Sequence, residues 1–267
     1  MMSLPGEVAD AAEAGNLDAV RSWLDGRPAD GGDWVNSRDE NGWTLLLCCV
    51  MPDTSKPPHA DLLRLLLRRG ADVNLCATHP GAVGGSPLHY AADPDTNCID
   101  PLCVLLEAKP NVNRRTPRKT TTQDNPHEGL LETPLGNLLV HTQHNDDLPL
   151  HFLTKATALL RAGATLDAIC QDFSADELLG AAEIRRPRLA EEEEFVKVKA
   201  LVAGVRVAGS WKSFCRKDHR QILRLRSLVA RGRARERLTT SRAAKFIVRL
   251  GDNGVVWHIL SYWRETQ

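Results

Sequence analysis

Three stretches of the sequence carry side chains of the kinds used for nucleophilic attack, proton transfer or metal binding. The first, GGSPLHYAAD at residues 84–93, places Ser86, His89 and Asp93 in one short run. A serine paired with a histidine base is a possible nucleophile. The same residues are also typical of the start of a helix, because Ser86 is a suitable N-cap and Pro87 suits the first helical turn. We therefore predict that His89 is a hydrogen-bonding structural residue.

The second stretch, HTQHNDDLPLH at residues 141–151, is rich in potential metal ligands. These are His141, His144, Asp146, Asp147 and His151. His141 and His144 would share a helix face at i, i+3 spacing, as metal ligands often do. The repeat alignment described below places the stretch in a turn between two helices, where polar residues are the default. The prediction is therefore no metal ion and no cofactor.

The third stretch, EEEE at residues 191–194, is an acidic run. It is predicted to be the solvated first turn of a helix that continues from Phe195 to Ala203, since carboxylates are favoured near a helix N-terminus. Gly-rich phosphate loops, nucleophile elbows and paired carboxylates do not stand out elsewhere. We predict no catalytic residues and a chain that is not an enzyme.

All three stretches sit within a recurring pattern. Short apolar helices that begin at a hydroxyl or acidic residue are expected at NGWTLLLCCV (41–50), GGSPLHYAA (84–92), LETPLGNLLV (131–140) and SADELLGAA (174–182). Each is followed by a second helical pattern: LLRLLLRRGADVN (62–74), LCVLLEAKPNVN (102–113), ATALLRAGATLD (156–167) and VKALVAGVRV (198–207). VADAAEAGNLDAVRSWLDG followed by DWVN is a shortened version at the front. The sequence predicts five units of helix, turn, helix and loop.

The tracts GADVN, SPLHYAA and DENGWTLLL resemble the ankyrin repeat, over about residues 5–207. The resemblance implies an all-α, ankyrin-type helical repeat solenoid that acts as a non-enzymatic protein-binding module. A C-terminal helical cap is expected in addition, from the helical pattern of the residues that follow. The sequence departs from the motif in places. Leu45 replaces a proline, Leu47 and Gly136 replace the histidine, and Lys109 replaces the glycine that ends the second helix.

Helix ends and small residues support this pattern on physical grounds. Gly70, Gly163 and Gly204 are expected just after second helices, where a left-handed turn satisfies the last carbonyls. Lys109 must then take this conformation without being glycine. Ala91 and Ala92 are small enough to let neighbouring units approach, so that each unit buries a face that it cannot bury alone.

Composition bounds the class of protein. The chain has 267 residues, 42% hydrophobic and 25% charged, which is typical of a folded protein. The N-terminus lacks the basic and apolar regions of a signal peptide, and no apolar run approaches about 20 residues. We therefore expect an intracellular, cytoplasmic or nuclear location without membrane association. Seven cysteines without a C-x-x-C pair are predicted to be reduced thiols packed as small hydrophobes.

Charge divides the chain. Residues 1–204 hold 19 Lys and Arg against 30 Asp and Glu, whereas residues 205–249 hold 14 against 2. We predict a solenoid at residues 1–208 and a basic helical capping module at residues 209–267. Its first helix, DHRQILRLRSLVARG, presents Arg220, Arg224 and Arg231 on one face. Its apolar residues, expected on another face, are Ile222, Leu225, Leu228 and Val229.

Two more helices are expected, at TSRAAKFIVRL and NGVVWHILSYWRE. RLGDNGVVWHILSYW also resembles the first helix of an F-box, although Gly251 stands where that motif has proline. This implies an alternative function as substrate adaptor of a ubiquitin ligase. A further alternative is binding of nucleic acid or another anionic partner through the basic segment.

The main functional expectation is a scaffold or adaptor that binds another protein through its loops and inner helix face. The resemblance assigns variable contacts to Glu40, Asn41, Trp43, Met51 and Asp93, with Trp43 as the best anchor unless it packs against the next loop. The loop at 114–132 is the longest, and it offers phosphorylation sites at Thr116 and within Thr120–Thr122.

Overall fold

The computed structural model describes residues 3–27, 33–51, 59–78, 84–96, 98–117, 131–144, 147–232 and 255–256. The chain forms two compact units, Met1–Ala203 and Gly204–Gln267. The predicted division into a solenoid ending at residue 208 and a capping module stays a prediction. Among the described residues, no helix is both long and apolar enough to cross a membrane.

The first unit is built from pairs of short helices. The first helices of the pairs are α1 (Gly6–Glu13), α3 (Leu45–Val50), α5 (Pro87–Ala91), α7 (Pro134–His141) and α9 (Ala175–Arg185). The second helices are α2 (Leu17–Asp25), α4 (Ala60–Arg68), α6 (Asp100–Glu107), α8 (Phe152–Arg161) and α10 (Glu193–Ala208). The 3-10 turn η1 (Pro187–Glu191) precedes α10, which continues past Ala203, the last residue of the first unit.

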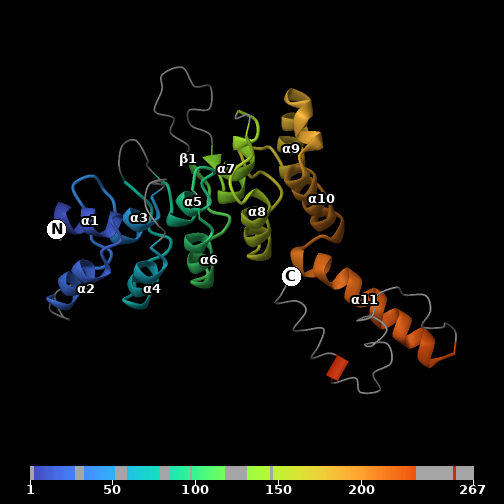
Figure 1. The fold of residues 1–267 in the computed structure, drawn as a ribbon, viewed down its shortest axis with the longest axis horizontal. Helices are drawn as coiled ribbons and strands as arrows, with labels where there is room; N and C mark the ends of the chain where they lie inside the picture. Colours follow the sequence, from blue (N-terminus) through green and yellow to red (C-terminus); the bar gives the residue numbers. More distant parts are fainter. Residues whose placement is uncertain are drawn as a thin grey trace. The chain divides into compact units, whose positions relative to one another are not determined.

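The pairs stack in sequence order. Each first helix contacts the next, from α1 through α9, and the second helices α2, α4, α6 and α8 contact one another in the same way. Figure 1 shows these as two rows of helices running side by side. This arrangement confirms the predicted all-α helical repeat solenoid. One short antiparallel strand pair, β1 (Thr116–Pro117) with β2 (Leu131–Glu132), was not predicted.

Hydroxyl residues precede α3, α5, α7 and α9, as the sequence indicates, whereas α1 follows Pro5. The expected capping bond of Ser86 is wrong, because its hydroxyl bonds the ring of His89 and no backbone amide. The Thr44 hydroxyl accepts a hydrogen bond from the Leu47 amide at 3.3 Å, and Thr133 accepts from the Gly136 amide at 3.1 Å. Ser174 forms a capping box with Glu177, in which each side chain accepts from the other residue's backbone. These bonds satisfy amide groups that lack partners inside the helix.

Left-handed residues follow the second helices α4, α6, α8 and α10, whereas Gly26 after α2 has φ of −76°. Gly70 and Gly163 have φ of 91° and 100°, and Lys109 has φ of 55°, which confirms those three predictions. The prediction for Gly204 is wrong, because α10 continues through it to Ala208 and Gly209 takes the left-handed conformation instead. Gly204 has a packing role, since a Cβ there would overlap the ring of Phe214.

Asparagines in the loops tie successive repeats together. The Asn36 side chain accepts from the Asp72 amide at 2.8 Å, and Asn74 accepts from the Asn111 amide at 2.7 Å. Asn113 repeats the contact with the Thr165 amide at 2.8 Å. A side chain of one repeat thus satisfies a backbone group of the next, which fixes their register.

Small and apolar residues fill the space between the helix rows. Six alanines with no exposed surface are Ala12, Ala91, Ala92, Ala156, Ala175 and Ala182. The seven cysteines are free, and four of them, Cys48, Cys49, Cys76 and Cys170, are buried. Burial raises the pKa of the Cys48 thiol to about 12, so this thiol is held in its neutral, unreactive form. The packing prediction is confirmed for these four cysteines.

The second unit contains α11 (Trp211–Ala230). The helix starts earlier than predicted, with the Ser210 hydroxyl accepting from the Ser213 amide, and it ends before Gly232, which has φ of 67°. Trp211 and Phe214 pack with ring centroids 5.9 Å apart. The two later predicted helices and the F-box-like stretch lie outside the described residues, apart from Val255 and Val256, which are helical.

Candidate functional site

Between the repeats of the first unit, the chain makes connections that we call fingers. Each finger precedes a first helix and is closed by backbone hydrogen bonds. The closing contacts are Asp39 N to Trp43 O at 2.9 Å before α3, Ala77 N to Gly85 O at 2.8 Å before α5, the β1–β2 pair before α7, and Ile169 N to Phe173 O at 2.9 Å before α9.

The finger before α3 is held rigidly. One carboxylate oxygen of Asp39 accepts from the Asn41 amide at 3.0 Å and from the Trp43 amide at 2.7 Å, and Arg38 donates to the Gly42 carbonyl at 2.7 Å. Glu40 and Asn41, both predicted contact residues, are exposed at its tip. The finger therefore presents free side chains on a fixed backbone.

Trp43 and Met51 differ in their surroundings. The Trp43 ring is half-buried and packs edge-on against Tyr90 of α5, with centroids 5.7 Å apart. Trp43 thus braces its finger against the next repeat, the alternative that the sequence left open. Met51 follows the last residue of α3 and is 37% exposed.

Asp93, another predicted contact residue, is half-buried beyond the end of α5. Its carboxylate accepts from the Asp95 amide at 3.0 Å, and burial raises its pKa. Its main-chain carbonyl accepts from Lys155 at 2.6 Å, and Lys155 also donates to the Thr96 carbonyl at 2.8 Å. Lys155, on α8, therefore fastens one repeat to the inter-helix turn of the preceding one.

Sequence reasoning missed Lys155. The side chain has no exposed surface, and burial lowers its pKa to about 8. The sequence feature that could have indicated this role is a lysine within the apolar segment FLTKATALLR. Lys155 lies on the same buried face of α8 as Phe152 and Leu159.

We expect Lys155→Met to lower the free energy of unfolding by about 1–3 kcal/mol, because a buried and a partly buried carbonyl group lose their donor. Urea unfolding followed by circular dichroism measures the change. Lys199→Met on α10 is the matched control, since Lys199 pairs with Glu183 at the surface and should shift stability by about 0.5 kcal/mol or less. Unchanged or greater stability of Lys155→Met would contradict the assigned role.

His89 joins α5 to the next finger. Its Nε2 donates to the Glu132 carbonyl at 3.1 Å, so Nδ1 is free to accept from the Ser86 hydroxyl at 2.7 Å. Ser86 and His89 are both buried, and burial lowers the pKa of His89 to about 4. Because Nε2 binds a backbone carbonyl and not Asp93, the three residues do not form a relay. The structural role predicted for His89 is confirmed.

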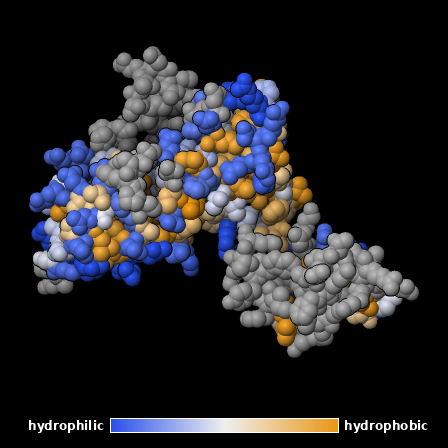
Figure 2. Space-filling model, in the orientation of Figure 1, coloured by the Kyte–Doolittle hydropathy of each residue, from blue (hydrophilic) through white to orange (hydrophobic). Residues whose placement is uncertain are grey.

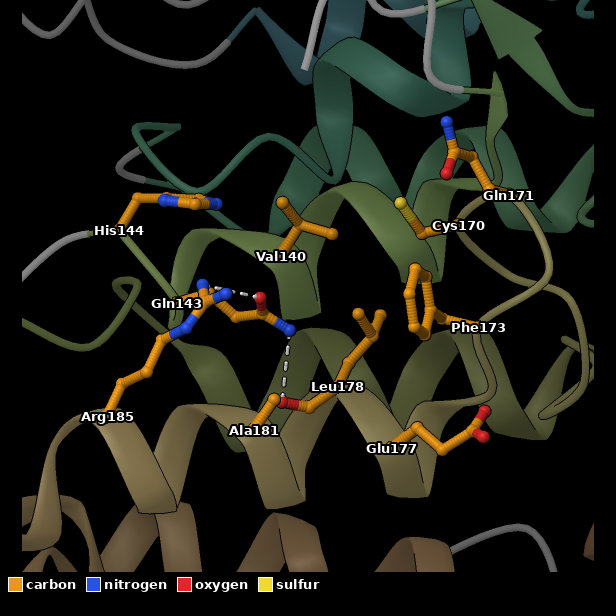
Figure 3. Close-up of a pocket in the computed structure, with 10 residues that line it drawn as sticks. All are labelled: Val140, Gln143, His144, Cys170, Gln171, Phe173, Glu177, Leu178, Ala181 and Arg185. Carbon is orange, nitrogen blue, oxygen red and sulfur yellow. Dashed lines mark hydrogen bonds between the residues drawn. The ribbon is translucent and has the colours of Figure 1, made fainter. Parts of the chain in front are cut away.

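A groove lies between α7 and α9, with a volume of about 380 Å³. Figure 3 shows Val140, Leu178 and Phe173 along its floor and wall, with Gln143 and Arg185 at one end and Glu177 at the other. Gln143 donates to the Leu178 carbonyl at 3.2 Å and accepts from Arg185 at 3.1 Å. The sequence analysis did not predict this groove. The feature that could have indicated it is Phe173, an aromatic residue within a finger.

A family model for ankyrin repeats, in three copies, matches residues 8–116. Residues 8–116 are ankyrin repeats. No curated protein matches the chain. The predicted range of 5–207 extends further, and α7 to α10 continue the same paired-helix pattern beyond the matched residues.

Ankyrin repeats are in general protein–protein interaction modules and are generally not enzymes. The histidine-rich stretch follows this repeat architecture. His141 ends α7, and His144, Asp147 and His151 lie between α7 and α8 as predicted, whereas Asp146 is outside the described residues. In the described part of the chain, no group of three or more His, Cys, Asp or Glu residues is placed to hold a metal ion.

The remaining predicted sites lie at the edges of the ankyrin stack or in the second unit. Thr116 is 5% exposed in β1, so the interpretation of this threonine as an accessible phosphorylation site is wrong for the folded chain. Thr120–Thr122 lie outside the described residues. On α11, Arg224 and Arg231 are exposed, and the side chain of Arg220 lies outside the described part.

Proposed function

We propose that the chain is a scaffold or adaptor that binds a partner protein through its fingers and first helices. The contact residues in this proposal are Glu40, Asn41, Trp43, Met51 and Asp93. The observation that carries it is the finger before α3, whose backbone is fixed by Asp39 while its tip residues remain exposed. A surface ordered in advance loses little conformational entropy when it binds.

The five residues have different parts in this proposal. Glu40 and Asn41 supply polar contacts, and Met51 supplies an adaptable apolar one, since its unbranched side chain fits surfaces of varied shape. Trp43 acts mainly by holding the finger against Tyr90. Asp93 contributes through the turn that Lys155 holds.

The test is capture of partner proteins by the full chain, quantified by mass spectrometry. Glu40→Ala, Asn41→Ala and Met51→Ala combined should reduce capture by about tenfold, a loss of roughly 1.4 kcal/mol. Folding should be unchanged because the replaced side chains are exposed. Asp61→Ala with Arg64→Ala, an exposed ion pair on α4, is the matched control. Equal capture by the two variants would refute the proposal.

Binding of an anionic partner, nucleic acid included, through α11 is a second candidate, supported by the exposure of Arg224 and Arg231. In the same experiment, Arg224→Glu with Arg231→Glu would then abolish capture while the finger variant would not. The adaptor role in a ubiquitin ligase stays a prediction from the sequence. A cytoplasmic or nuclear location is part of the proposal.

A further inference from the structure

The groove between α7 and α9 has an apolar floor that stays accessible. Val140 and Leu178 are 2% and 4% exposed and form the base, and Cys170 closes one side. Phe173 is 53% exposed, although it is an aromatic residue beside an apolar hollow. Figure 2 shows hydrophobic side chains gathered over α7 to α9 with hydrophilic ones around them. Exposed apolar surface framed by polar groups is typical of a binding site.

The finger before α9 fixes Phe173 in this position. Phe173 donates its amide to the Cys170 carbonyl at 2.9 Å and accepts at its own carbonyl from the Ile169 amide. The two-residue tip has Gln171 in the left-handed region, with φ of 48°. A turn this tight holds the aromatic ring next to the groove without any partner present.

One end of the groove is cationic and is also fixed. Gln143 spans the gap, because its amide nitrogen binds the Leu178 carbonyl of α9 and its amide oxygen accepts from the Arg185 guanidinium. Arg185 remains exposed, and a guanidinium has five donors, of which this bond uses one. The remaining donors suit a carboxylate, which arginine binds in a two-pronged geometry.

The opposite end is anionic and already engaged. One carboxylate oxygen of Glu177 binds the backbone and hydroxyl of Ser174 in the capping box. The groove thus offers an apolar hollow with an exposed guanidinium at one end and a carboxylate at the other. A complementary ligand carries a large apolar side chain for the hollow and an acidic group at the Arg185 end. It carries no acidic group at the Glu177 end, where two carboxylates would repel each other.

We infer that this groove binds a segment of a partner protein in which a large apolar residue lies next to an acidic one. The apolar side chain enters beside Phe173, and the acidic side chain pairs with Arg185. A protein segment is the occupant because Phe173, Glu177 and Arg185 are all exposed along the rim, so a chain can lie across the opening. The inference rests on the proposed function and adds the chemistry of the partner.

The test uses a phage-displayed library of random 12-residue peptides, selected against the full chain. Peptides with Leu, Ile, Met or Phe within two positions of Asp or Glu should be enriched. A selected peptide, made synthetically, should bind Phe173→Ala and Arg185→Glu about tenfold more weakly than the unmodified protein. Arg188→Glu is the matched control, because Arg188 is exposed and does not line the groove. The peptide's affinity for this variant should stay within about twofold of its affinity for the unmodified protein.

Two outcomes would overturn the inference. One is a selected peptide that binds Phe173→Ala and Arg185→Glu as tightly as it binds the unmodified protein. The other is concentration-dependent dimerisation that Phe173→Ala abolishes, which would make a second copy the occupant. Peptides that give the first outcome and that depend on Glu40 and Met51 would reject the groove and leave the proposed function in place. A partner captured from cells independently of the finger residues but dependent on Arg185 would reject the proposed contacts and retain the groove.

Discussion

Gly136→Ala is expected to destabilise the repeat stack by about 3 kcal/mol, which is opposite in sign to the usual effect of this change inside a helix. Alanine is favoured over glycine in a helix by about 1 kcal/mol. At Gly136, however, an added Cβ would overlap the carbonyl oxygen of Ile169, a backbone atom of the finger before α9. Overpacking of this kind typically costs about 1–3 kcal/mol or more, because the backbone must move.

The contact cannot be relieved by a side-chain rotation. The Ile169 carbonyl also accepts from the Thr133 amide at 2.8 Å, immediately before α7, so moving the carbonyl away breaks this bond. The same movement would shift the finger that carries Phe173. We therefore expect Gly136→Ala to weaken both the stack and the groove between α7 and α9.

Gly180→Ala is the matched control. Gly180 lies within α9, and an added Cβ there has no atom within 4 Å. This variant should be more stable than the unmodified protein by about 0.5–1 kcal/mol. Urea unfolding of both variants, followed by circular dichroism, gives the comparison. If both substitutions raise the unfolding midpoint, the close approach of α7 to Ile169 does not exist in solution.

Gly136 also shows where sequence reasoning stops. The sequence marks it as a departure from the ankyrin motif, because glycine stands where His89 stands in the preceding repeat. His89 reaches the next finger through a hydrogen bond, whereas Gly136 lets the next finger approach directly. The sequence shows that glycine replaces the histidine of the motif. It does not show the distance between α7 and Ile169, because that distance depends on how two repeats stack.

The local features were predictable because they depend on neighbours in the chain. Hydroxyl caps at Thr44 and Thr133, the left-handed Lys109 and the small Ala91 follow from the geometry of a single helix or turn. Gly204 was misassigned for the same reason, since the pattern indicates a helix end and cannot show that Phe214 packs there. Helix ends predicted from neighbouring residues are therefore correct unless a residue from another helix packs against them.

Contacts between repeats were not predictable. Lys155 meets carbonyl groups about sixty positions earlier in the chain, and the groove brings together residues from α7, a finger and α9. The periodicity and spacing of residues in the sequence do not predict contacts between segments that are far apart in the chain. The contact residues Glu40, Asn41, Trp43, Met51 and Asp93 came from a family resemblance, and their roles in binding stay predictions.

His89 should make the stability of the repeat stack fall in mild acid. Burial, together with the nearby Arg114 guanidinium, lowers the pKa of His89 in the folded chain to about 4, against about 6.5 when unfolded. Between these pH values the unfolded chain binds a proton that the folded chain does not, so acid favours unfolding. The stabilising effect is complete above pH 6.5 and is lost progressively as the pH falls towards 4. The full difference is about 3 kcal/mol.

The neutral variant His89→Gln isolates this contribution from that of the carboxylates. Glutamine does not titrate, so its unfolding free energy should fall less steeply than that of the unmodified protein over the same pH range. At pH 7 the variant should be less stable, because glutamine does not reproduce both contacts of the ring, to Ser86 and to the Glu132 carbonyl. The two curves should therefore converge towards pH 4. Urea unfolding at intervals from pH 7 to pH 4 measures them, and parallel curves would mean that His89 is not held neutral between α5 and the next finger.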